Sequence, residues 1–167
     1  KVTVSCPEAC PTYTARYIRN VNNKAETPKW MKDRLTAIGL RPISALVDIT
    51  NYINYDLARP LHVFDADKLK GDIQVRMAHD GEEFLALNEK SYMLDNKALG
   101  ICDDEGVQCL GGIMGGLNKG SYEDTKNVLL ECALFTPACI ARTGRKLQLD
   151  SDSRARYERW VDPMSNI

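Results

Sequence analysis

The spacing of hydrophobic residues predicts one strand and two helices in the first third of the chain. The segment from Thr12 to Val21 has the two-residue alternation of a β-strand. Thr27 and Pro28 then supply an N-cap and a first-turn proline for a helix that ends at Gly39. The apolar residues of this first helix are Trp30, Met31, Leu35 and Ile38.

A second helix is predicted from about Ser44. Its apolar side chains recur at the 3.6-residue period of a core-facing side and are Leu46, Ile49, Ile53 and Leu57. A second stripe is polar and consists of Asp48, Asn51, Tyr52 and Tyr55. Taken alone, this is an ordinary surface helix with a solvated face. A Pro-Leu-His turn follows at residues 60–62, so the polar groups could instead be aimed into a pocket.

After Asp67 the pattern changes to short strands separated by turn residues. They are expected at Ile73–Met77, Glu82–Leu87, Ser91–Leu94, Leu99–Cys102 and Val128–Leu134. Helices return at Thr136-Pro137 and, capped by Ser151, from Asp152 to about Trp160. Because strands and helices are segregated, the sequence predicts an α+β fold with a mixed or antiparallel, sandwich-like core and flanking helices. We expect one module; the alternative is two intertwined parts, a helix-rich 1–70 and a strand-rich 71–167.

Composition and charge narrow the function classes. The 167 residues are 44% hydrophobic, enough for a substantial core, and the net charge of -1 gives no overall field that would hold a polyphosphate backbone. The six cysteines contain no CxxC pair and lie mostly among apolar neighbours, so reduced thiols in a cytoplasmic protein are expected and a metal site is not. No membrane span or signal peptide is apparent. The first residue is Lys1, and we expect a piece of a longer polypeptide.

Glu131 is the sharpest single signal for chemistry. It is the only charged residue in V-L-L-E-C-A-L-F, residues 128–135, where both faces of the expected strand are otherwise apolar. A buried carboxylate without a partner costs several kcal/mol. Glu131 must therefore be exposed, paired, or aimed into a polar pocket, and the residues alone leave these three options open.

Two further motifs are ambiguous by themselves. The run GGIMGG at residues 111–116 is neither GxGxxG nor a Walker loop, so its glycines form either a tight turn or a close approach to a ligand. His62 in the Pro-Leu-His turn is structural or a pocket residue, whereas His79 lies in a charged turn and is expected to be solvated. No cysteine or serine lies in a recognisable nucleophile motif, which argues against a covalent acyl-enzyme.

Several of these stretches together resemble the editing module of the beta subunit of bacterial phenylalanyl-tRNA synthetase. The family pattern R-P-I, V-D-I-T-N-Y, P-L-H and F-D is present between residues 41 and 65. The stretches GGIMGG, N-V-L-L-E-C-A-L-F and R-Y-E-R-W-V-D-P agree in order and spacing, at residues 111–116, 127–135 and 156–163. The matches extend over about four-fifths of the chain, so chance agreement in one motif does not explain them.

The resemblance implies hydrolysis of Tyr-tRNA(Phe) by a positioned water. Glu131 would accept the hydroxyl of the misattached tyrosine, and His62 and Asn51 would position water and the terminal adenosine at the CCA end. The resemblance implies that the substrate pocket is lined by Gly112, Gly115, Gly116, Ala133, Ser151 and Ser153. It implies no cofactor in this domain; ATP and Mg²⁺ would serve only the parent enzyme. The remainder of the beta subunit and the alpha subunit would be partners in a heterotetramer of two alpha and two beta chains, without a membrane.

The sequence departs from the family pattern near its C-terminal helix. Ser151 and Ser153 replace a usual threonine and alanine, and Arg154 and Trp160 replace a usual serine and glycine. These changes support a rival hypothesis, a non-catalytic assembly module of the synthetase with a degenerate pocket. A stand-alone deacylase is less favoured, because a free enzyme must hold tRNA itself.

Overall fold

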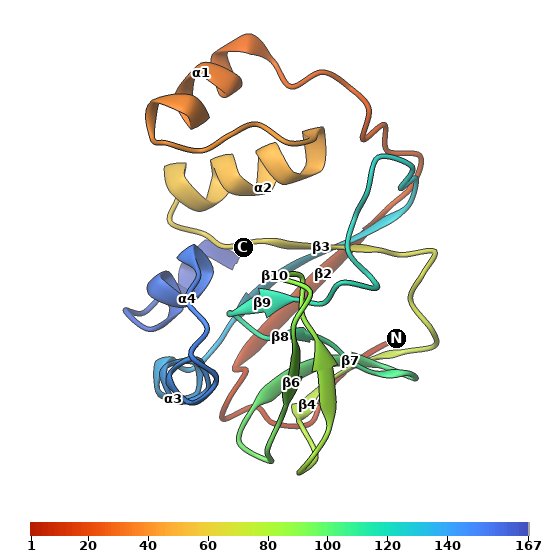
Figure 1. Ribbon diagram of the computed structural model, residues 1–167, viewed down its shortest axis with the longest axis vertical. Helices are drawn as coiled ribbons and strands as arrows, with labels where there is room; N and C mark the ends of the chain where they lie inside the picture. The colour runs from red at the N-terminus through yellow and green to blue at the C-terminus, as the bar shows by residue number, and fades with distance from the viewer. Residues whose placement is uncertain (167) are drawn as a thin grey trace.

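The computed structural model describes residues 1–166 as three sheets flanked by helices (Figure 1). The strands are β1 (Val2–Val4), β2 (Thr12–Ile18), β3 (His62–Asp65), β4 (Ile73–Met77), β5 (Glu83–Leu85), β6 (Ser91–Met93), β7 (Leu99–Asp103), β8 (Gly106–Leu110), β9 (Met114–Gly115) and β10 (Val128–Leu134). The helices are α1 (Lys29–Ala37), α2 (Ala45–Asp56), α3 (Pro137–Leu147), α4 (Asp152–Tyr157) and the 3₁₀ helix η1 (Pro163–Asn166).

The sheets confirm the α+β expectation. The largest sheet has the order β1-β4-β7-β8-β9, in which only β1 and β4 are parallel. The second sheet has the order β2-β10-β3 and is antiparallel, and β5 pairs with β6 in a hairpin. One buried cluster contains side chains from both main sheets, including Val75, Ile101 and Leu110 from the first and Phe64 and Ala133 from the second. The core therefore lies between the two sheets.

Both sheets join residues 1–70 to the rest of the chain. Strand β1 pairs with β4, and β10 lies between β2 and β3. Neither part of the expected division at residue 70 contains all the strands of either main sheet.

Helices α1 and α2 form a separate layer above β3 (Figure 1), and the expectation for the buried side of α2 was wrong. Ile49 is 45% exposed and Leu57 is 62% exposed, whereas Asp48 and Asn54 are buried. Asp48 is buried because its carboxylate accepts hydrogen bonds from the Ile43 amide and the Thr27 hydroxyl. These bonds satisfy a polar group that the hydrophobic period assigns to solvent.

The same contact corrects the predicted start of α1. Thr27 makes no cap bond to the helix, and Pro28 occupies the N-cap position. The Thr27 hydroxyl instead bonds Asp48 of the neighbouring helix. The cap predicted for α4 is confirmed, because the Ser151 hydroxyl accepts a hydrogen bond from the Arg154 amide at 3.0 Å.

Two bulk properties bear on function. The six cysteine side chains form no disulfide. The longest helix in residues 1–166 is α2, whose 12 residues are too few to span a bilayer.

Candidate functional site

The pairing of β10 with β3 brings the two most informative residues of the sequence together. Glu131 lies directly opposite His62 in the antiparallel register. Directly opposite residues of such a pair project from the same face of the sheet. The Pro60-Leu61 segment that precedes β3 lines the same cavity as these two side chains.

Glu131 is buried and hydrogen-bonded. Its side chain is only 4% exposed, and its Oε2 accepts a hydrogen bond of 2.9 Å from the Tyr13 hydroxyl of β2. Burial raises the pKa of Glu131 to about 7, an effect that the Tyr13 bond partly offsets. Of the three options that the sequence left open, the structure therefore combines two: the carboxyl group has a partner and faces a cavity.

His62 is electrically neutral at physiological pH. Removal from water lowers its pKa to about 4. Its ring meets the Phe64 ring edge to face, with centroids 4.3 Å apart. A neutral imidazole has one donor and one acceptor nitrogen, so it can orient a water molecule but does not form an ion pair with Glu131.

The glycine loop at residues 111–116 is shaped by close approach. Gly112 has a φ of +70°, and a Cβ there would lie 2.9 Å from Phe135. A Cβ on Gly115 would lie 2.5 Å from Cε1 of His62, and one on Gly116 would lie 2.6 Å from the Gln108 carbonyl oxygen. A side chain at each position would therefore require a different neighbour to shift: the Phe135 ring, the His62 ring or the backbone of β8.

Two serines at the start of α4 hold this loop through hydrogen bonds. The Ser151 hydroxyl donates to the Ile113 carbonyl oxygen at 2.6 Å, and the Ser153 hydroxyl donates to the Gly112 carbonyl oxygen at 3.1 Å. Ser153 lines the cavity and Ser151 does not. Arg154 points away into ion pairs with Asp150 and Glu158.

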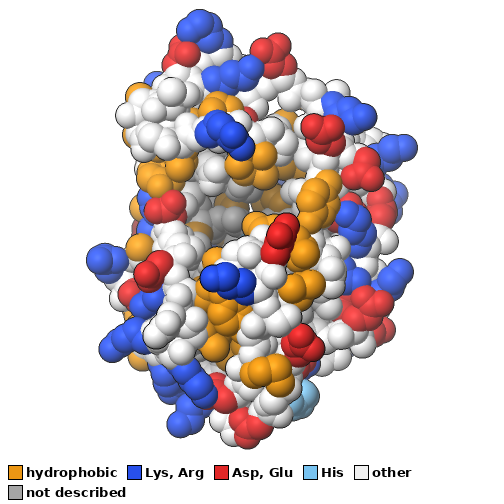
Figure 2. All heavy atoms as spheres, viewed as in Figure 1, with side chains coloured by type: hydrophobic (Ala, Val, Ile, Leu, Met, Phe, Trp, Pro, Cys, Tyr) orange, Lys and Arg blue, Asp and Glu red, His pale blue; other side chains and the backbone are white. Residues whose placement is uncertain are grey.

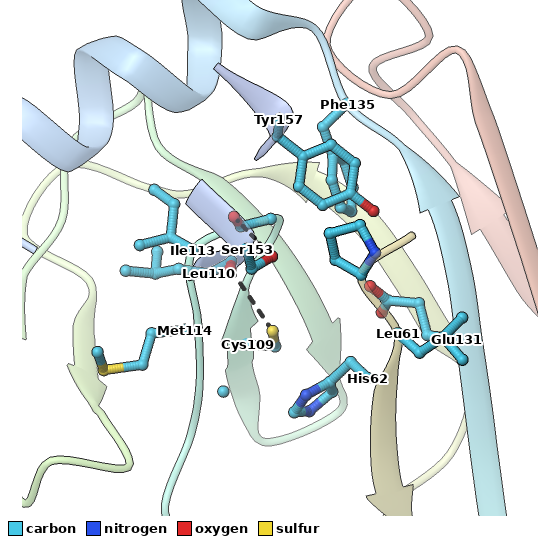
Figure 3. Close-up of a pocket in the computed structure, with 13 residues that line it drawn as sticks. Leu61, His62, Cys109, Leu110, Ile113, Met114, Glu131, Phe135, Ser153 and Tyr157 are labelled. Carbon is cyan, nitrogen blue, oxygen red and sulfur yellow. Dashed lines mark hydrogen bonds between the residues drawn. The ribbon is translucent and has the colours of Figure 1, made fainter. Parts of the chain in front are cut away.

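Two cavities share His62 as a lining residue; we call the one that Glu131 lines the inner cavity and the one beside α2 the outer cavity. The inner one, of about 80 Å³, has Glu131 and His62 on one side and Ile113 and Met114 across from them (Figure 3). The outer one, of about 190 Å³, is bordered by Leu46, Val47 and Thr50 of α2. Leu61, His62 and Gly115 line both cavities. The His62 ring thus lies between a small cavity that contains the Glu131 carboxyl group and a wider cavity beside α2.

The other residues named from the sequence take different positions. Gly112 lines the inner cavity, Gly115 both, and Gly116 the outer one. Among the described residues, Asn51 and Ala133 line neither cavity. Ala133 contributes its backbone carbonyl, which accepts hydrogen bonds from the Tyr157 hydroxyl at 2.9 Å and from Arg59 at 2.8 Å.

Sequence reasoning missed Tyr13, Phe135 and Tyr157. Tyr13 supports Glu131 from β2, and the other two line the inner cavity with their rings 4.9 Å apart. The position of Tyr13 in a predicted strand was a usable signal, since a strand residue can reach the carboxylate of a neighbouring strand. The pairing of β2 with β10, however, was not evident from the sequence.

The described residues offer no metal centre. Within residues 1–166, no group of three or more His, Cys, Asp and Glu side chains is arranged to hold an ion.

With this geometry in view, comparison with known proteins defines the class. The B3/4 domain family model matches residues 9–166, and the chain belongs to this family. The chain is also similar over nearly its whole length to one segment of the phenylalanine–tRNA ligase beta subunit. It is 52% identical to that of Mesorhizobium japonicum over 98% of this chain and 20% of the relative. It is 57% identical to that of Paramagnetospirillum magneticum over 93% of this chain and 19% of the relative.

The chain therefore spans about a fifth of the length of these curated relatives. An N-terminal fragment of the phenylalanyl-tRNA synthetase beta subunit from Pyrococcus horikoshii has a similar fold, with a TM-score of 0.56. The match covers 86% of this chain and 48% of that one at 18% identity. The resemblance noted from the sequence motifs is thus confirmed at the level of the family.

Proposed function

We propose that this chain is an editing module that hydrolyses the ester of tyrosine wrongly attached to tRNA(Phe). The single observation that carries the proposal is the buried carboxyl group of Glu131 in the inner cavity, opposite His62. In this proposal the aryl group enters the inner cavity, the ester lies beside His62, and the terminal adenosine occupies the outer cavity.

The chemistry suits discrimination between tyrosine and phenylalanine. A synthetic pocket that is mostly apolar does not strongly exclude one added hydroxyl. A hydrogen bond from the tyrosine hydroxyl to an ionised carboxylate is worth roughly 1.5–3 kcal/mol, which favours tyrosine by about 10- to 150-fold. Phenylalanine would leave the buried Glu131 carboxylate without this donor. The site would therefore select for the hydroxyl that distinguishes the wrong amino acid.

Hydrolysis here needs a positioned water and no protein nucleophile. The aminoacyl ester is already activated, so holding water in line with its carbonyl accounts for much of the rate. The neutral His62 ring borders both cavities and can hold such a water. Asn51 keeps its proposed role only if binding of the adenosine brings the α2 amide to the ester.

The size of the inner cavity adds a requirement. Its volume of about 80 Å³ is less than the ~150 Å³ of an engineered cavity that admits benzene. Entry of a phenol ring therefore requires the lining to move. Met114 is suited to this, because its unbranched side chain adopts several shapes at low cost.

The similarity to phenylalanine–tRNA ligase beta subunits supports a proposal for the parent assembly. We propose that the chain acts within a beta subunit, paired with an alpha subunit in a cytoplasmic heterotetramer that uses ATP and Mg²⁺ for aminoacylation. Figure 2 shows side chains of both charge signs spread over one face of the domain. With a net charge of -1, the domain lacks a general field for RNA, so other parts of the assembly would deliver the CCA end.

The test is deacylation of Tyr-tRNA(Phe) by the full-length synthetase carrying Glu131→Ala. Clearance of tyrosine should fall at least tenfold, while aminoacylation with phenylalanine is retained. The matched control is Glu83→Ala, which removes an exposed glutamate of β5. Unchanged clearance of tyrosine by Glu131→Ala would reject the proposal.

The small cavity also favours the second candidate, a non-catalytic assembly module. If the pocket is degenerate, the unmodified enzyme should fail to clear Tyr-tRNA(Phe), and the Glu131 variant should behave like it. Removal of the module would then disturb subunit assembly without raising the level of misacylation.

A further inference from the structure

We propose that Tyr13 is a positioning residue for Glu131: its hydroxyl holds one carboxylate oxygen so that the other is presented to the inner cavity. The inference rests on the proposed function and adds a residue to it. The contact is the 2.9 Å hydrogen bond from the Tyr13 hydroxyl to Oε2 of Glu131. Among the described residues, no other side chain is hydrogen-bonded to the Glu131 carboxylate.

The register of β2 and β10 explains how Tyr13 reaches Glu131. Tyr13 lies opposite Ala133, and Glu131 lies opposite Ala15. Residues two apart along a strand share a face, so Tyr13 and Glu131 are diagonal neighbours on one face of this pair. The small side chain of Ala15 leaves space for the tyrosine to reach across. Tyr13 does not line the inner cavity and so supports the carboxylate without occupying the substrate space.

The surroundings of Glu131 make this single bond important. Five titratable groups surround its carboxyl group. They are Cys10 before β2, Tyr13 of β2, His62 of β3, Cys109 of β8 and Tyr157 of α4. None of these groups is charged at neutral pH, because burial raises the pKa of the thiols and phenols and lowers that of His62. The buried cation Arg59 is bonded instead to the Cys132 sulfur and the Ala133 carbonyl oxygen. The Tyr13 bond is therefore the interaction that favours the charged form of Glu131 against the effect of burial.

Loss of this bond would change the chemistry of recognition. With a pKa near 7, Glu131 is close to balance between its charged and neutral forms at neutral pH. Without Tyr13 the balance moves toward the neutral acid, which is a weaker acceptor for a phenol. The freed carboxyl group also gains rotational freedom, so it is no longer aimed at one place.

The experiment measures deacylation of Tyr-tRNA(Phe) by the full-length synthetase carrying Tyr13→Phe between pH 6 and 8.5, with spontaneous ester hydrolysis subtracted. The midpoint of the pH profile should rise by about one unit, with about a fivefold loss of rate at pH 7 and recovery at the alkaline end. The control is Tyr17→Phe on the same strand, a half-exposed tyrosine whose loss of a hydroxyl should leave the profile unchanged.

A second replacement moves the profile the other way. Substituting 3,5-difluorotyrosine at position 13 keeps the ring and makes the hydroxyl a stronger donor, so the midpoint should fall below that of the unmodified enzyme. A purely structural role for Tyr13 predicts an equal loss of rate at every pH and no opposite shift, and that result would overturn the inference. Activity that persists in Glu131→Ala would reject the proposed function itself. Loss in Glu131→Ala with an unshifted Tyr13→Phe profile would reject only the role of Tyr13.

Discussion

At the scale of single residues, burial shifts the pKa values of Glu131 and His62 in opposite directions. Burial favours the neutral form of each group, raising the pKa of the acid to about 7 and lowering that of the base to about 4. Both are thus largely neutral between pH 4.5 and 6.5, and they lie opposite each other without forming an ion pair. The charged form of Glu131, the stronger acceptor for a hydroxyl, therefore becomes populated only as the pH approaches 7.

This pairing predicts opposite effects of pH on stability. Folded Glu131 keeps its proton where the unfolded chain has lost it, so its contribution to stability falls as pH rises from 4.5 to about 7. Folded His62 lacks a proton that the unfolded chain binds, so its contribution rises with pH from about 4 to 6.5. Each effect is worth about 3 kcal/mol at most, and that of the half-buried His62 is the smaller.

The measurement is urea denaturation of the chain at pH 5, 6 and 7. Relative to the unmodified protein, Glu131→Gln should gain stability as pH rises, and His62→Gln should lose it. Other titrating groups are common to all three proteins and cancel in the differences. Parallel curves for Glu131→Gln and the unmodified protein would mean that Glu131 titrates normally.

At the scale of elements, two glycines of the loop are constrained by different neighbours. Gly115 approaches a side chain that faces the cavities, whereas Gly116 approaches the backbone of β8. A methyl group at Gly115 can be accommodated by rotation of the His62 ring, but the Gln108 carbonyl cannot move without disturbing the sheet. Function and stability should therefore respond to different glycines of the same loop.

We accordingly expect Gly115→Ala to reduce deacylation of Tyr-tRNA(Phe) by about 100-fold with little loss of stability, because it displaces His62. Gly116→Ala should lower the free energy of unfolding by about 1–3 kcal/mol. Deacylation kinetics and urea denaturation of both variants provide the comparison. The explanation is wrong if Gly115→Ala is as unstable as Gly116→Ala and edits normally.

The elements also mark how far the sequence reveals this fold. Strands β4 and β10 were predicted with their observed bounds, because the alternation I-Q-V-R-M of β4 and the mostly apolar run of β10 are strong local signals. Strand β3 was missed, since its short run obtains strand geometry from β10, which is distant in sequence. Strand β8 was missed although it forms a hairpin with the adjacent strand β7. The apolar stripe of α2 was misleading because Asp48 is buried in tertiary hydrogen bonds. Glu131 was recognisable from its isolated charge, but its partner Tyr13 lies 118 residues away.

At the scale of the whole molecule, strand order ties the site to the stability of the complete chain. Glu131, His62 and Tyr13 lie on three adjacent strands, and β10 in the middle comes from the far end of the sequence. The cavity forms only when this pairing is complete. Local loss of the first 70 residues would remove both neighbours of β10 and with them the site.

The chain should therefore unfold as one cooperative unit, and its two tryptophans can test this. Trp30 lies on α1 in the first part and Trp160 follows α4 in the second, so Trp160→Phe and Trp30→Phe each leave one fluorescent reporter. Because both main sheets join the two parts, the two parts should unfold together. In each variant, the urea midpoint from tryptophan fluorescence should therefore agree within about 0.2 M with the midpoint from circular dichroism of the same variant. A Trp30 transition at clearly lower urea would show that the α1–α2 layer unfolds independently, since its main attachments to the sheet below are the contacts of α2 with β3. The inner cavity would then survive the loss of α1 and α2, whereas the outer cavity, which α2 borders, would not.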